Sequence, residues 1–164
     1  MDRERFAEFD GRITGLFADH GIILLRISIG LVFLWFGALK FWPGLSPADA
    51  LALDTIDRLT FGLLPGTLAR VGLAVLETAI GFGLIFGKAL RLTLLLLAGQ
   101  MLGTVTPLVL FPDVTWAGLG VPTLEGQYIL KNVVLATAGI VIGATVRGGR
   151  LIDDPEAAEL VGRH

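Results

Sequence analysis

Residues 22–42 read IILLRISIGLVFLWFGALKFW, an almost unbroken apolar run that is long enough to cross a bilayer as an α-helix. Two cations interrupt it, Arg26 near one end and Lys40 near the other. Counted in steps of three and four residues, one stripe of this helix carries Arg26, Gly30, Phe33, Gly37 and Lys40. A lipid-facing surface would not carry both cations and both glycines on one line. We therefore expect this stripe to face the interior of a helix bundle.

The composition is that of an integral membrane protein. The chain has 164 residues, of which 54% are hydrophobic and 17% are charged, whereas soluble domains carry about 25% charged residues. The net charge of −2 gives no basic surplus for a nucleic-acid partner. Cysteine is absent and there are only two histidines. We therefore expect neither a disulfide nor a metal site.

Further apolar runs predict three more spanning helices. The four predicted spans cover about residues 22–42, 68–86, 90–110 and 127–146. They lie in a transmembrane domain over residues 21–147. The sequence thus predicts an all-α membrane protein, a four-transmembrane-helix bundle whose main partner is the lipid bilayer.

The segments outside the spans have distinct patterns. Residues 1–20 repeat apolar side chains at helical spacing among charges, which predicts an N-terminal amphipathic helix at the membrane surface. Residues 46–64 are moderately apolar and predict a short interfacial helix between the first two spans. Residues 111–126 are expected to form a loop, and residues 148–164 a polar cytoplasmic tail.

The charges at the two ends of the spans predict the orientation. Most basic residues fall on the side of the two termini, namely Arg3, Arg5, Arg12, Lys88, Arg91, Arg147, Arg150 and Arg163. Because lysine and arginine accumulate in cytoplasmic loops, both termini should be cytoplasmic.

Polar and ionisable side chains inside the spans are the candidate functional residues, because each charge costs at least ~2.5–3.5 kcal/mol to insert. The predicted polar cluster or ligand pocket comprises Arg26, Lys40, Glu77, Gln100, Thr104, Gln127, Lys131 and Asn132. Its centre should be Arg26, Glu77 and Gln100, with Lys40, Gln127 and Lys131 nearer the outer surface. Small-residue stripes predict helix packing at Gly30, Gly37, Gly81, Gly139 and Gly143.

Two interpretations of this cluster stay open. The charges either pair helices in a small bundle, or they form a pocket that binds a quinone or lipid head group or relays a proton. No catalytic residue is singled out by the pattern.

Four stretches together resemble the DoxX-like membrane proteins, and the similarity is closest to the YkgB-type branch. They are RISIGLVFLWFGALKF at 26–41, LETAIGFGLIFGKALR at 76–91, TVTPLVLF at 104–111 and EGQYILKNVVL at 125–135. The resemblance implies a four-helix bundle in a bacterial cytoplasmic (inner) membrane. It also implies characteristic positions at Arg26, Gly30, Gly37, Lys40, Glu77, Gly81, Gln127, Lys131 and Asn132. Some relatives are small subunits of quinone-reducing sulfur oxidoreductases, and others are tied to resistance against oxidative stress.

The function expected from these observations is that of an accessory subunit of a membrane-bound redox or respiratory-type assembly. Its partners would be other membrane protein subunits or further copies of the chain, and it would have no catalytic activity of its own. One alternative is a quinone-linked oxidoreductase in which Glu77 or Lys131 transfers protons. Another is a small oligomeric transporter or channel.

Overall fold

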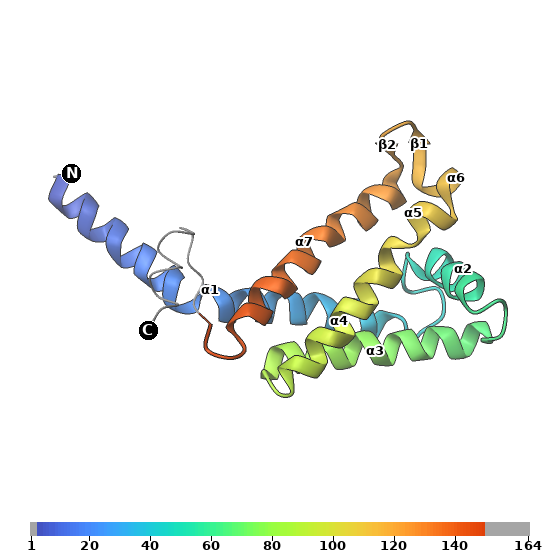
Figure 1. Cartoon of the computed structure of the whole chain (residues 1–164), viewed down its shortest axis with the longest axis horizontal. Helices are drawn as coiled ribbons and strands as arrows, with labels where there is room; N and C mark the ends of the chain where they lie inside the picture. Colours follow the sequence, from blue (N-terminus) through green and yellow to red (C-terminus); the bar gives the residue numbers. More distant parts are fainter. Residues whose placement is uncertain (1–2, 150–164) are drawn as a thin grey trace.

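A computed structural model describes residues 3–149, and it begins with α1 (Arg3–Leu39), one continuous helix of 37 residues. A helix of this length extends about 55 Å, well beyond the ~30 Å core of a bilayer. Figure 1 shows its N-terminal part projecting away from the other helices. The predicted N-terminal helix and the first predicted span are thus parts of one helix, which has no break at residue 20. The helix runs through it because no proline or left-handed glycine interrupts residues 10–22.

The predicted interfacial helix between the first two spans is α2 (Asp49–Leu59). The chain leaves α1 through a series of turns in which Gly44 has a φ of +75°. After α2 the chain reverses again through Phe61 and Gly62, which also have positive φ. α2 packs against the second span and lies over one end of the bundle (Figure 1).

The second and third spans form a tight helical hairpin. α3 (Gly66–Phe86) begins directly after Pro65 and ends at Gly87, whose φ of +67° lies in the left-handed region. α4 (Leu90–Val105) follows after a short turn. It gives way to α5 (Pro107–Leu110), because proline has no amide hydrogen to continue the helical ladder. α4 and α5 together make the third span.

The predicted loop at 111–126 contains regular structure that the sequence reasoning missed. α6 (Pro112–Thr115) leads into the strand β1 (Trp116–Gly118), which pairs antiparallel with β2 (Val121–Pro122). The indole Nε1 of Trp116 donates a hydrogen bond to the carbonyl of Leu108 at 3.0 Å. Strands this short carry no alternating pattern that could reveal them in a sequence.

The fourth span is α7 (Leu124–Thr145), which begins three residues before the predicted start at Gln127. Its N-cap is Thr123, whose hydroxyl oxygen accepts a hydrogen bond from the amide of Gly126 at 3.2 Å. Such a cap satisfies one of the free amides in the first turn and fixes where the helix starts.

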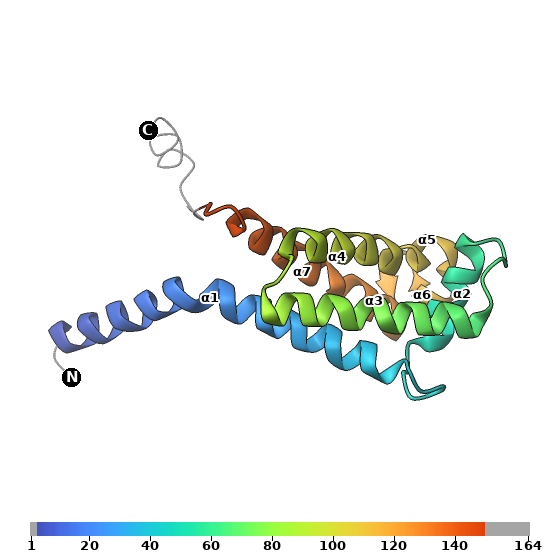
Figure 2. The same ribbon diagram turned by 90° about the horizontal axis from the view of Figure 1, so that it is seen from below.

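The four spanning helices form a closed bundle (Figure 2). α3 packs against α1 and α4, and α7 packs against α4 and α1. The core is made by the buried side chains Ile29, Phe33, Ile80, Leu84, Leu97, Met101, Ala138 and Ile142. α2, α5, α6 and the hairpin gather at one end, and the two ends of the described chain lie toward the other (Figure 1).

Most of the outer surface of this bundle is apolar. The four helices are long and apolar enough to cross a membrane, and large side chains such as Trp35 and Leu95 are each 70% exposed. Exposed apolar area on this scale is expected where lipid, rather than water, covers the protein. The fold is therefore that of an all-α, multi-pass membrane protein with four spanning helices.

Glycines allow α1 and α3 to approach closely. A Cβ atom on Gly81 would lie only 2.6 Å from the backbone nitrogen of Leu34, and one on Gly37 would lie 2.8 Å from the backbone nitrogen of Thr78. A Cβ atom on Gly30 would lie 3.0 Å from the carbonyl oxygen of Gly81. These contacts fix the register of the two helices, because no larger residue fits at the crossing.

The other two glycines predicted to pack helices lie on α7, opposite α4. A Cβ atom on Gly139 would lie 3.0 Å from Cδ2 of Leu97, and one on Gly143 would lie 3.7 Å from Cδ1 of Leu94. The neighbours here are flexible side-chain tips. Packing of α4 against α7 is therefore looser than the crossing of α1 and α3.

Candidate functional site

A buried ion pair joins the first and second spans. Lys40 directly follows the last residue of α1 and is 5% exposed. Its Nζ lies 2.7 Å from Oε2 of Glu77 and also donates a longer hydrogen bond of 3.4 Å to the carbonyl of Phe36. The inward stripe of α1 thus ends in a cation that meets a carboxylate.

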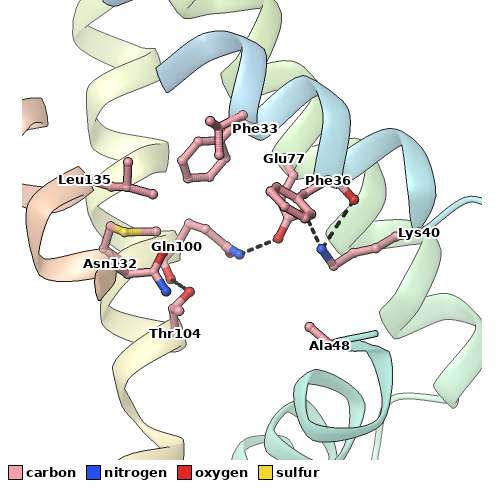
Figure 3. A pocket seen from close by; sticks show the side chains of 11 residues that line it. Phe33, Phe36, Lys40, Ala48, Glu77, Gln100, Thr104, Asn132 and Leu135 are labelled. Carbon is pink, nitrogen blue, oxygen red and sulfur yellow. Dashed lines mark hydrogen bonds and ion pairs between the residues drawn. The ribbon is translucent and has the colours of Figure 1, made fainter. Parts of the chain in front are cut away.

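Glu77 connects three helices. It lies near the middle of α3, where it is 7% exposed, and its second oxygen, Oε1, accepts a hydrogen bond of 3.0 Å from Nε2 of Gln100 on α4. Figure 3 shows Lys40 and Gln100 reaching the carboxylate from opposite sides. Both carboxylate oxygens are therefore hydrogen-bonded, which is the condition under which a buried ion pair is tolerated.

A pocket of about 170 Å³ lies beside the ion pair. Residues from all four spans line it, and the turn before α2 contributes one more. The lining residues are Val32, Phe33, Phe36, Lys40, Ala48, Glu77, Gln100, Met101, Thr104, Asn132 and Leu135. A cavity of roughly 150 Å³ admits a benzene ring, so a small cyclic head group has room here.

The polar residues deeper in the pocket are held by their own helices. The hydroxyl of Thr104 donates to the carbonyl of Gln100 at 2.9 Å, and the amide of Asn132 donates to the carbonyl of Tyr128 at 3.0 Å. Both side chains lie beside the pocket in Figure 3. Because these bonds are local, either residue can be replaced without breaking a contact between helices.

Three predicted members of the cluster lie elsewhere. The guanidinium of Arg26 lies against Gly87 at the far end of α3, about 15 Å along the helix from Glu77. Lys131 is exposed and its Nζ lies 5.0 Å from the ring centroid of Tyr128. The third, Gln127, is also exposed at the start of α7.

The prediction that Arg26 lies beside Glu77 is wrong, and the alignment of α1 with α3 explains why. α1 and α3 run antiparallel, and the glycine contacts set Gly37 against Glu77. Lys40 lies one turn beyond Gly37 and so meets the carboxylate, whereas Arg26 lies about 21 Å earlier on α1. The side chain of Arg26 is too short to span that distance.

Sequence reasoning also missed two groups at the edge of this site. Oδ2 of Asp49, the first residue of α2, is buried and has no hydrogen-bond partner within residues 3–149. Ser46 is 5% exposed, and its hydroxyl likewise has no partner. The sequence predicts that Asp49 lies on an interfacial helix, where a charged side chain can reach water. Its burial follows only from the way α2 folds back against α3.

The fold and the site together define a four-helix membrane protein with a buried ion pair beside a small polar pocket. Comparison with known proteins adds no identity to this class: no family model, no curated protein and no solved structure matches the chain.

Gln100→Leu is expected to lower the free energy of unfolding by about 1.5–3 kcal/mol, because the lost hydrogen bond is one to a charged group. Unfolding in mixed detergent micelles, followed by circular dichroism, measures the loss. Gln127→Leu on the exposed start of α7 is the control and should change stability little. Equal losses in the two variants would show that the bond to Glu77 contributes nothing.

Proposed function

We propose that the chain is a DoxX-like membrane protein of the YkgB type, an accessory subunit of a membrane-bound redox or respiratory-type assembly. In this proposal the pocket beside Lys40 and Glu77 binds the head group of a quinone or a lipid. The four stretches of the sequence that resemble the family support the first part. The chemistry of the pocket supports the second.

One observation carries the assignment of a ligand: the pocket has hydrogen-bonding capacity that the described protein leaves unused. The ammonium group of Lys40 has three N–H donors, and residues 3–149 accept two of them. The side-chain amides of Gln100 and Asn132 each have two N–H donors, and each donates one bond within the same residues. A head group with carbonyl or hydroxyl oxygens matches these donors.

The position of the pocket favours a ligand that arrives from the bilayer. Val32 and Phe36 line the pocket and are 39% and 49% exposed on the apolar surface of α1. An opening between such side chains suits a polar ring that carries an apolar tail. A ligand of this kind keeps its tail among the acyl chains while its head group reaches Lys40.

Asn132→Leu is expected to weaken binding of decylubiquinone by about two- to tenfold, because it removes one hydrogen bond worth ~0.5–1.5 kcal/mol without breaking a hydrogen bond between helices. Isothermal titration calorimetry on the purified full chain in mild detergent measures the affinity. Tyr128→Phe, one turn earlier on the exposed face of α7, is the matched control. The quinone assignment is wrong if decylubiquinone shows no saturable binding, or if the two variants bind it equally.

The accessory role has its own test. Purification of the tagged chain from its native membrane in mild detergent should yield a complex that contains at least one redox subunit, because the chain contributes no cysteine and thus no thiol chemistry. A chain that always runs without a partner contradicts this part of the proposal. That result would leave the affinity for a quinone unaffected.

The basic residues support a bacterial inner-membrane protein with both termini in the cytoplasm. Of the described termini-side residues, Arg5, Lys88, Arg91 and Arg147 are exposed. The opposite half carries Lys40, Arg58, Arg70 and Lys131, of which Arg58 and Lys131 are exposed. A surplus of exposed cations is typical of the cytoplasmic side.

A further inference from the structure

A second hollow lies at the opposite end of the bundle from α2, where α3 turns into α4. It has a volume of about 530 Å³ and is lined by Gly87, Ala89, Leu90, Arg91, Leu92 and Val146. Figures 1 and 2 both place the end of α7 beside this turn. The hollow therefore lies between two spanning helices, at the level where their apolar sequences end.

Cations surround this hollow. Arg91 lines it, Lys88 lies in the turn itself, and Arg147 directly follows the lining residue Val146. All three side chains are exposed. Within residues 3–149 none of the three has an ion pair with an acid. The charge at this site is thus uncompensated by the part of the chain that the structure describes.

Arg26 does not line the hollow, but its side chain contacts Gly87, which does. Its guanidinium lies so close to Gly87 that Nη1 would be 2.6 Å from a Cβ atom at that position. Its Nε is buried and has no hydrogen-bond partner. Because protein encloses this Nε, an anion bound in the hollow acts on Arg26 through its charge and not through a hydrogen bond to Nε.

The backbone at the start of α4 also favours a bound anion. The lining residues 89–92 make the N-cap and first turn of α4, which has no side-chain cap and no acidic residue. The free amides and the positive end of the helix dipole therefore face the hollow without internal compensation. This adds to the charge of the arginines but would not by itself define a site.

We propose that this hollow binds the phosphate of an anionic phospholipid. Arg91 contacts the phosphate, Lys88 and Arg147 attract the negative head group to the surface, and Arg26 adds its charge from beside Gly87. Apolar side chains continue directly from the hollow, with Leu92 58% and Phe86 65% exposed. They provide the surface along which acyl chains lie. Basic pockets between spanning helices bind anionic head groups in this way.

The experiment uses the purified full chain in a non-ionic detergent. Native mass spectrometry should detect a retained phosphatidylglycerol molecule, and much less phosphatidylcholine at the same concentration. The double variant Lys88→Gln, Arg91→Gln should lower the retained phosphatidylglycerol by about tenfold or more, because two attractive charges are lost. Lys131→Gln, which removes an exposed cation at the opposite end, should leave it unchanged.

The thermal unfolding temperature provides a second readout, and it tests the contribution of Arg26. Added phosphatidylglycerol should raise it in the wild type and raise it less in Arg26→Gln, while inorganic phosphate should have no effect. Equal retention of the two lipids would overturn the proposal. So would retention that the double variant leaves unchanged, or an equal effect of inorganic phosphate. Loss of quinone binding at the other pocket does not bear on either readout.

Discussion

Lys40→Met, with Glu77 retained, is expected to lower the free energy of unfolding by about 3–5 kcal/mol, the cost of leaving one buried charge without its partner. The methionine keeps most of the side-chain volume, so the loss reports the charge and not a cavity. Glu77 would retain only the bond of 3.0 Å from Gln100. Unfolding by sodium dodecyl sulfate in mixed micelles measures the difference.

The double variant Lys40→Met, Glu77→Leu is the control for this prediction. It removes both charges together and should be close to the wild type in stability, since a buried ion pair can be replaced by apolar residues of similar volume. Lys131→Met removes an exposed lysine that contacts Tyr128 and should cost less than about 1 kcal/mol. If Lys40→Met is no worse than Lys131→Met, the ion pair does not hold the first two spans together.

Gly81→Ala should destabilise the bundle by about 3 kcal/mol, because a single added methyl group forces α1 and α3 apart. The nearest atoms are backbone atoms of α1, with the nitrogen of Leu34 at 2.6 Å and the carbonyl oxygen of Gly30 at 2.9 Å. Backbone cannot move aside as a side chain can, so the helices must separate. Thermal unfolding in detergent, followed by circular dichroism, gives the change.

Gly99→Ala is the matched control, since Gly99 also lies within a spanning helix but has no atom within 4 Å of its added Cβ. It should leave stability unchanged or raise it by up to about 1 kcal/mol, the difference in helix propensity. A Gly81→Ala protein as stable as Gly99→Ala would mean that the close crossing of α1 and α3 does not exist.

The positions of the four spans could be predicted from the sequence because long apolar runs have few alternatives. The inward face of α1 was also predictable, since Phe33, Gly37 and Lys40 share one stripe and all three are buried. What the pattern could not supply is how far one helix is shifted along another. The contacts of Gly37 and Gly81 set that shift, and it decides that Glu77 meets Lys40 and not Arg26.

Two other features depended on information that the sequence pattern does not carry. The hairpin that follows α6 is too short to produce a periodic signal, and one of its anchors is the bond from Trp116 to the carbonyl of Leu108. The burial of Asp49 Oδ2 depends on how α2 folds back against α3. Each is a consequence of tertiary packing, which composition and periodicity do not report.

The buried ion pair with Lys40 requires that Glu77, near the middle of the second span, faces protein and not lipid. A cryo-electron microscopy map of the chain in a lipid nanodisc tests it most directly. The map should show α3 crossing the bilayer, with the Lys40 ammonium at hydrogen-bonding distance from the Glu77 carboxylate, close to the 2.7 Å of the present structure. A Glu77 side chain directed at acyl chains, or an α3 that lies flat on the membrane, would contradict the claim.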